Sequence, residues 1–157
     1  MRIGHSKDVH QLVAGRPLIL GGVELDHHLG LLGHSDADVL THVIIESIIG
    51  ALGVGDIGKH FPDTDPLYKG ANSMDLLIAT KKMLDESPYK IGNLDATIYA
   101  EQPKMRPHID KMRSNLAEVL EIDLSQINIK ATRGEGMGYI GRSEGMGAEC
   151  VILLKEK

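Results

Sequence analysis

The sequence is poor in the residues on which disulfide-rich and aromatic-rich proteins depend. Its 157 residues include one Cys, no Trp, one Phe and four Tyr. The lone cysteine, Cys150, excludes an intramolecular disulfide framework and a cysteine-rich zinc site. It precedes the apolar run Val151–Leu154, which indicates a buried, inert thiol. Too few aromatic rings remain to form the stacking platforms that bind single-stranded nucleic acid.

Long apolar runs and an excess of basic charge are also missing. No stretch approaches the roughly 18 apolar residues that cross a bilayer, and the start, Met1–His5, lacks the apolar region of a signal peptide. The formal net charge of −5 argues against a nucleic-acid-binding surface. A small anionic ligand is still compatible with this charge. We therefore expect a soluble, cytoplasmic protein that binds neither nucleic acid nor membrane.

The chain is predicted to form a single catalytic domain over residues 1–157. This length provides one hydrophobic core, and 42% apolar with 25% charged residues is ordinary for a globular protein. Apolar periodicity and turn residues predict strands and helices in alternation. Strands are expected at 3–12, 18–20, 23–25, 91–100, 127–132 and 148–155, and helices at 35–50, 72–86 and 107–120.

This order of elements predicts a two-layer α/β (α+β) sandwich, in which helices cover one face of a mixed β-sheet. The last strand is apolar at consecutive positions, Val151–Leu154, which indicates burial on both faces of the sheet. The face without helices therefore needs a partner, and an oligomer is expected.

Three polar residues in the first third of the chain could bind a metal. Asp8 and His10 stand two positions apart on a predicted strand, so both side chains point to one face. His42 comes from the first helix, which should pack on that sheet. One oxygen and two nitrogens form a three-ligand zinc set with a fourth position open, as in catalytic zinc sites. Asp-x-His is a common pattern, however, and hydrogen-bonded histidines without a metal are an alternative.

The neighbouring polar residues have two interpretations each. Asp38 is better explained as part of a helix cap than as a ligand. Glu46, one turn after His42, either orients that histidine as an acceptor or is solvated. The loop Asp56–Pro66 is rich in acids and prolines, which fits either a loop that binds sugar hydroxyls or an exposed Asp-Pro turn.

A glycine pattern near the C-terminus, Gly136–Gly141, matches G-x-G-x-x-G. The dinucleotide-binding motif of this form requires a strand before it and a helix opening within it. Here the glycines lead instead through Arg142–Gly145 into another strand. A dinucleotide site is therefore rejected, and either a plain connecting loop or a loop that approaches phosphate remains possible.

Taken together, several blocks of the sequence resemble the 2-C-methyl-D-erythritol 2,4-cyclodiphosphate synthase family. The likeness covers essentially the whole chain, and the His-Ser-Asp-x-Asp and Phe-Pro-Asp-Thr-Asp-Pro blocks are its most specific parts. It rests on Asp8-Val9-His10, His34–Val39, His42, Gly55–Lys59, Phe61–Pro66, Pro103-Lys104-Met105, Lys130-Ala131-Thr132, Glu135 and Gly141-Arg142.

The resemblance implies a homotrimer with active sites at its subunit interfaces and a reaction of non-mevalonate isoprenoid biosynthesis. The implied substrate is 4-diphosphocytidyl-2-C-methyl-D-erythritol 2-phosphate. Its 2-phosphate oxygen attacks the β-phosphorus, CMP leaves and a cyclic diphosphate forms. Zn²⁺ is implied at Asp8, His10 and His42, and Mg²⁺ or Mn²⁺ at Glu135, bridging the α- and β-phosphates.

The same likeness implies roles for individual residues. His34, Arg133 and Glu135 are expected to be catalytic, with His34 stabilising the transition state. Arg142 is expected near the central cavity of the trimer, where the family can hold an isoprenoid diphosphate. The residues expected to contact substrate are Asp8, His10, His34, Ser35, Asp56, Gly58, Phe61, Pro62, Asp63, Thr64, Asp65, Ala100, Lys104, Met105, Thr132, Tyr139 and Arg142.

The sequence departs from the family pattern at a few positions. Arg133 replaces the second Thr of the usual Thr-Thr-Thr-Glu, and it either supplies a charge-assisted hydrogen bond in place of that hydroxyl or points away. Lys7 replaces a usual Phe near the trimer axis, Arg106 a common Leu, and Glu46 a frequent Asp. Two rival functions are a metal-dependent phosphohydrolase and a non-catalytic trimeric module that binds nucleotide or isoprenoid diphosphate.

Overall fold

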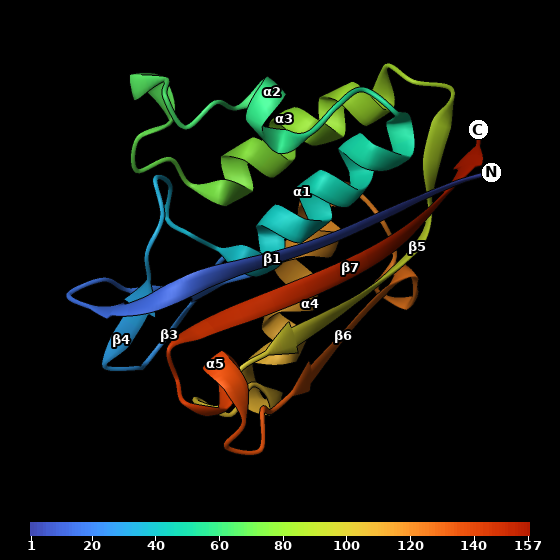
Figure 1. Cartoon of the computed structure of the whole chain (residues 1–157). Coiled ribbons are helices and arrows are strands. Elements are labelled where there is room, and N and C mark those ends of the chain that lie inside the picture. Colours follow the sequence, from blue (N-terminus) through green and yellow to red (C-terminus); the bar gives the residue numbers. More distant parts are fainter.

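The computed structural model describes residues 1–157 and contains a curved, five-stranded sheet with the order β4-β1-β7-β5-β6 (Figure 1). Only β5 and β6 are parallel; the other neighbours are antiparallel, so the predicted mixed sheet is confirmed. A separate hairpin pairs β2 with β3 around Gly21-Gly22. The strands are β1 Arg2–Ala14, β2 Leu18–Leu20, β3 Val23–Leu25, β4 Leu29–Leu31, β5 Tyr89–Tyr99, β6 Ile127–Thr132 and β7 Gly145–Glu156.

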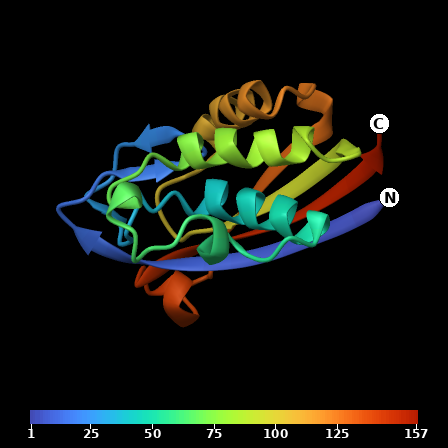
Figure 2. The same ribbon diagram turned by 90° about the horizontal axis from the view of Figure 1, so that it is seen from above.

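Three long helices cover one face of the sheet, as predicted, and the short α5 lies on the opposite side (Figure 2). A cluster of 35 buried hydrophobic residues fills the space between the layers. The helical segments are α1 Val39–Leu52, α2 Ile57–His60, η1 Pro66–Tyr68, α3 Ser73–Asp85, α4 Arg106–Leu120, η2 Leu124–Gln126 and α5 Gly138–Gly141. None of these helices has the length and apolar character needed to cross a membrane.

The outer face of the sheet carries exposed apolar side chains. Gly4 faces α1, since a Cβ there would lie 1.8 Å from the carbonyl oxygen of Ser47. Because side chains alternate along a strand, the odd-numbered residues of β1 point away from the helices. Ile3 is 71% exposed, and Val151, on the neighbouring strand β7, is 48% exposed. The single chain therefore leaves these apolar side chains uncovered on a face that also carries polar residues such as Lys7 and Glu149.

The sequence prediction places some element boundaries wrongly. The first helix begins at Val39 rather than Ser35, because Ala37 adopts a left-handed conformation with φ of +59° and Asp38 caps the helix. Strand β4 was not predicted; it has only three residues, and it pairs with the end of β1. The two predicted loops contain the short helices α2 and α5.

Asp38 connects the helical layer to the β2–β3 hairpin. Its side chain has no solvent exposure. The carboxylate accepts hydrogen bonds from the backbone N–H of Thr41 at 3.0 Å, Gly21 at 2.9 Å and Gly22 at 2.8 Å, and from the Thr41 hydroxyl at 2.8 Å. The prediction that Asp38 caps the helix rather than binding a metal is therefore confirmed.

We expect the substitution Asp38→Ala to lower the free energy of unfolding by about 3 kcal/mol, because it removes a helix cap and leaves buried N–H groups without acceptors. Asn72→Ala is the matched control, because Asn72 is an exposed cap of α3 that accepts one hydrogen bond, from Met74 N–H. Its loss should cost about 1 kcal/mol. Urea denaturation measures both values, and equal losses would contradict a connecting role for Asp38.

Candidate functional site

Asp8, His10 and His42 converge at one edge of the helical layer, as the strand spacing predicts. Their candidate ligand atoms all lie within 4.8 Å of one another. The Nε2 atom of His10 is 3.0 Å from Asp8 Oδ2, and the Nδ1 atom of His42 is 3.5 Å from the same oxygen. Asp8 and His10 come from β1 and His42 from the first turn of α1, so packing of the helix on the strand builds the cluster.

The hydrogen bonds of His10 leave its second nitrogen facing a carboxylate. The Nδ1 atom lies 2.7 Å from the carbonyl oxygen of Leu32, which can only accept, so Nδ1 carries the proton. In the neutral ring the lone pair of Nε2 then faces Asp8 Oδ2, and two acceptors at 3.0 Å require a cation between or beside them. A proton or a divalent metal satisfies this need, so the three residues fit a metal.

The electrostatics of the pair agree with this geometry. Burial alone would raise the pKa of Asp8, but the interactions with the protonated imidazoles of His10 and His42 outweigh burial and bring that pKa well below its ordinary range. Burial alone would lower the pKa of His10, but the hydrogen bond and charge of Asp8 outweigh it and raise the pKa. The cluster thus holds an imidazole of raised basicity beside a carboxylate that stays ionised.

We expect metal affinity at this cluster to fall as the pH is lowered, because a metal requires the neutral imidazole and competes with the proton. The pKa of His10 lies above its ordinary value, so the competition begins above about pH 6.5 and reaches about tenfold per pH unit below that pKa. Chelator competition between about pH 8 and pH 6 measures the slope. An affinity that stays flat over this range would contradict His10 as a ligand.

His42 is held through its other ring nitrogen by Ser35 and by Ser73, a residue that the sequence did not single out. The Nε2 atom lies 2.9 Å from Ser73 Oγ and 3.2 Å from Ser35 Oγ. Asp36 in turn accepts hydrogen bonds from the backbone N–H and the hydroxyl of Ser73. The sequence signal for Ser73 was only its position at the start of a helix, which does not reveal the partner 31 positions earlier.

Glu46 has neither of the two roles considered for it. Its Oε2 atom accepts a hydrogen bond of 2.6 Å from the backbone N–H of Ile57, and its side chain is half-buried. Since Ile57 is the first residue of α2, Glu46 ties the loop after α1 to that helix. His42 is oriented by Ser73 and Ser35 instead.

A pocket of about 310 Å³ opens beside the cluster. Phe61 and Tyr68 form part of its wall, with ring centroids 5.6 Å apart and nearly perpendicular rings. The residues lining it are Asp8, His10, His34, Ser35, His42, Ile57, Gly58, Phe61, Asp63, Tyr68 and Leu76. We call this pocket, with its metal cluster, the metal half-site.

Other acids of the Asp56–Pro66 loop hold the loop's own backbone. Asp56 caps α2 through Lys59 N–H at 2.8 Å, and Asp65 caps η1 through Leu67 N–H at 2.9 Å. The carbonyl oxygen of Asp65 lies 3.4 Å from His34 Nε2. Four residues of this loop that were expected to contact substrate do not line the pocket, namely Asp56, Pro62, Thr64 and Asp65. The loop is therefore ordered by its acids, and it reaches the pocket chiefly through Gly58, Phe61 and Asp63.

A second pocket of about 260 Å³ lies at the ends of β5 and β6 and the start of α4. It is lined by all four residues that were predicted to bind the nucleotide, namely Ala100, Lys104, Met105 and Thr132. The complete lining is Ala100, Glu101, Gln102, Pro103, Lys104, Met105, Arg106, Ile109, Ala131, Thr132 and Arg133. We call it the nucleotide half-site.

Glu101 is the one acid of this pocket and was missed by the sequence analysis. It receives the Arg133 guanidinium at 2.7 Å and the backbone N–H of Gly134 at 2.9 Å. The hydrogen bond from Arg133 lowers the pKa of Glu101. Glu101 therefore holds the start of the glycine loop and directs the exposed Arg133 side chain along the pocket rim.

The rest of the glycine loop lines neither pocket. Glu135 is exposed, with φ of +52°, and Arg142 pairs with Glu144 at 3.0 Å. Tyr139 packs beside Gly145 and Gly147 on β7. The loop contains only the four-residue helix α5 and continues into β7, which agrees with the rejection of a dinucleotide motif.

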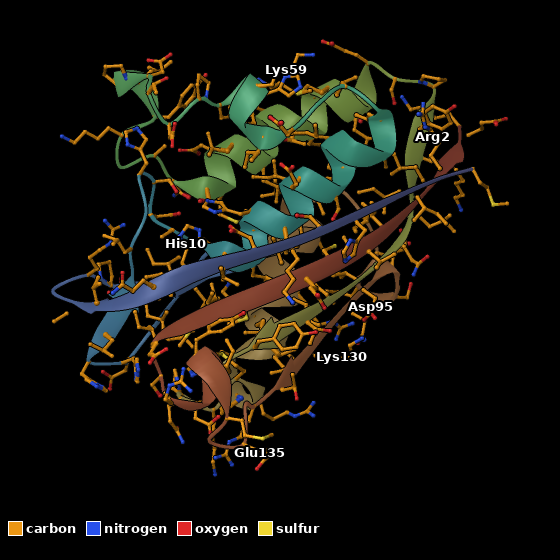
Figure 3. All side chains as sticks on the ribbon, viewed as in Figure 1. Arg2, His10, Lys59, Asp95, Lys130 and Glu135 are labelled. Carbon is orange, nitrogen blue, oxygen red and sulfur yellow. The ribbon has the colours of Figure 1, made fainter.

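The two half-sites lie apart on one chain. They share no lining residue, and β1 is separated from β6 by β7 and β5. Figure 3 shows the labelled side chains of His10 and Glu135 on different parts of the molecule. The residues predicted for the metal and those predicted for the nucleotide therefore line separate pockets of one chain.

Residues 1–155 match the YgbB family. A 2-C-methyl-D-erythritol 2,4-cyclodiphosphate synthase of Syntrophotalea carbinolica is 58% identical over 156 residues, which cover 99% of this chain and 95% of that relative. The synthase of Geobacter sulfurreducens is 57% identical over 157 residues, which cover 100% of both chains.

Solved structures have the same architecture. An IspF of Plasmodium falciparum in complex with CDP matches with a TM-score of 0.88 and 35% identity, over 99% of this chain and 96% of that chain. The bifunctional IspDF of Campylobacter jejuni matches with a TM-score of 0.95 and 42% identity, over 99% of this chain. This chain spans only 42% of the bifunctional protein.

Proposed function

The chain belongs to the YgbB family and catalyses the reaction of the 2-C-methyl-D-erythritol 2,4-cyclodiphosphate synthases, and we propose that two copies of the chain share each active site. The substrate is 4-diphosphocytidyl-2-C-methyl-D-erythritol 2-phosphate. A 2-phosphate oxygen forms a bond to the β-phosphorus, the bond between that phosphorus and the CMP oxygen breaks, and CMP leaves. The observation that carries the assignment is the Asp8, His10 and His42 cluster in a chain of this family.

In the metal half-site, Asp8, His10 and His42 would hold Zn²⁺. The ion, when bound, supplies Lewis-acid stabilisation of charge on a phosphoryl oxygen. His34 and Ser35 stand at the same pocket and would contact the reacting phosphates, with His34 stabilising the transition state. The methylerythritol would be enclosed by Gly58 and Phe61–Asp65, and Asp56 would hold their loop in place. Because nucleophile and electrophile belong to one molecule, their orientation contributes much of the rate, up to about 7–11 kcal/mol in favourable cases.

In the nucleotide half-site, Ala100, Lys104, Met105 and Thr132 would bind the cytidine diphosphate moiety. Lys104 is the exposed cation of that set, and buried Met105 and Ala100 form an apolar floor. Glu135, on the glycine loop that follows this pocket, would hold Mg²⁺ or Mn²⁺, and that ion would offset phosphate charge. Tyr139 would contact substrate from the same loop. The CDP complex of the Plasmodium falciparum relative supports a cytidine nucleotide at this fold.

A homotrimer would join the half-sites of neighbouring copies. The exposed apolar side chains of Ile3, Val9 and Val151 favour association of the outer sheet face with another copy. Lys7 lies on this face, 3.4 Å from Glu149. An isoprenoid diphosphate in a trimer-axis cavity would need cations, and Arg142 is the candidate, although it already pairs with Glu144.

Incubation with the authentic substrate and Mg²⁺, followed by ³¹P NMR, tests the function. We expect a cyclic diphosphate and CMP in equal amounts. Open-chain phosphates would instead indicate the metal-dependent phosphohydrolase, and CDP binding without turnover would indicate the non-catalytic module.

Elemental analysis of protein purified without added metal should find about one zinc per chain. A zinc content at background would contradict the metal assignment.

A further inference from the structure

The face of His42 that points away from the metal cluster contacts a buried chain of polar groups. Its Nε2 atom lies 2.9 Å from the hydroxyl of Ser73, which has no solvent exposure. Asp36 holds Ser73 twice, by a hydrogen bond of 3.0 Å to its backbone N–H and by a short hydrogen bond to its hydroxyl. These hydrogen bonds form a series that links the carboxylate of Asp36 in a loop, Ser73 at the start of α3 and His42 in α1.

The directions of these hydrogen bonds determine where the His42 proton lies. A carboxylate only accepts, and the Ser73 hydroxyl has one hydrogen, which it donates to Asp36. The Ser73 oxygen must then accept from His42, so Nε2 carries the proton. The lone pair is left on Nδ1, the nitrogen that lies 3.5 Å from Asp8 Oδ2 in the metal cluster.

The backbone around Asp36 is shaped to make these contacts. Ala37 has φ of +59°, a left-handed conformation that is unfavourable for a non-glycine residue. Its N–H donates to Ser35 Oγ at 3.1 Å, and the N–H of Asp38 donates to Asp36 Oδ1 at 3.1 Å. Helix capping does not explain Ser73, because Asn72 is the cap of α3.

We propose that Asp36 and Ser73 are positioning residues that fix His42 in its Nε2–H tautomer and so present Nδ1 to the metal. This inference rests on the metal centre in the proposed function. Hydrogen-bonded partners of this kind orient ligating histidines and increase their basicity, and their loss costs about 10- to 100-fold in metal affinity.

The test compares Ser73→Ala with Ser73→Thr, which keeps a hydroxyl, and with Asn72→Ala, which weakens the same helix start. Zinc affinity is measured by chelator competition. We expect Ser73→Ala to bind zinc about 10- to 100-fold more weakly, Ser73→Thr to recover most of the loss and Asn72→Ala to match the wild type. Wild-type affinity in Ser73→Ala, or an equal loss in Asn72→Ala, would overturn the proposal.

A second measurement does not depend on metal. Protein labelled with ¹⁵N-histidine and stripped of metal is observed by NMR at about pH 8.5, where an ordinary imidazole is neutral. His42 should show the Nε2–H tautomer in the wild type and a mixture in Ser73→Ala. An Nδ1–H form in the wild type overturns the proposal. If the tautomer is as expected but the wild type binds no zinc, the metal centre fails and the positioning of His42 stands.

Discussion

Two inactive variants, His42→Ala and Glu135→Gln, are expected to regain about a quarter of the wild-type activity when they assemble together in equal amounts. Each variant alone should lose at least about 10³-fold in kcat/KM, or about 4 kcal/mol of transition-state stabilisation. The first removes a metal ligand from the metal half-site, and the second removes the predicted anchor of the second ion, which lies on the glycine loop after the nucleotide half-site.

The reason for the recovery is the separation of the half-sites on one chain. If a neighbouring copy supplies the nucleotide half-site, a mixed assembly contains interfaces at which both halves are intact. With random mixing, a metal half-site is intact in half of the copies and meets an intact partner half the time. The product of these two fractions gives about one site in four.

Co-expression of the two variants with different affinity tags, and purification through both tags, provides the mixed assembly. Because this selection removes trimers of a single variant, the expected recovery in the purified trimer rises from a quarter to about a third. The wild type carrying both tags is the control for damage by purification. Recovery near zero would show that each active site lies within one copy and would refute the shared site. Sedimentation of the same preparations measures whether the assembly contains three copies.

Most of the fold follows from local patterns in the sequence. Apolar periodicity predicts β1, α1, α3, β5, α4, β6 and β7 to within a few residues. The start of α1 is misplaced because the left-handed Ala37 depends on the hydrogen bond that its backbone N–H donates to the Ser35 side chain, not on helix propensity. Strand β4 is missed because three residues carry too little periodicity, and only its pairing with Leu12–Ala14 defines it.

The candidate site is predictable only in part, for a similar reason. The i, i+2 spacing of Asp8 and His10 indicates a shared face, and packing of α1 then brings His42 to it. The Ser73 contact to His42 and the Glu101 contact to Arg133 join residues about 30 positions apart, on segments whose relative placement comes from tertiary packing. No local pattern encodes such pairs. Family resemblance suggests the positions of the ligands, but the hydrogen bonds that orient them required the structure.

Arg133 occupies the position of a usual Thr, and Glu101 determines where its charge lies. The guanidinium is exposed at the rim of the nucleotide pocket and pairs with Glu101 at 2.7 Å. Glu101 also lines the pocket, so the pair keeps the guanidinium at the pocket rim. A guanidinium there can donate a charge-assisted hydrogen bond to a phosphoryl oxygen where the usual residue would offer a hydroxyl.

We expect Arg133→Ala to lower kcat by about 10²-fold while the affinity for CMP changes little, because the lost donor acts on charge that develops during ring closure. Arg133→Thr restores the residue usual in the family and should recover much of kcat. Glu101→Gln, which keeps shape but removes the charge that anchors Arg133, should fall between the wild type and Arg133→Ala.

Single-turnover rates and CMP affinities of the four proteins separate the possible roles. A donor to the transition state lowers the rate of ring closure alone. Equal losses of rate and CMP affinity in Arg133→Ala would mean that Arg133 binds the nucleotide instead. An unchanged rate would mean that the Glu101 pair keeps the guanidinium from the phosphates, in which case Thr132 and Lys104 would be the remaining donors at that rim.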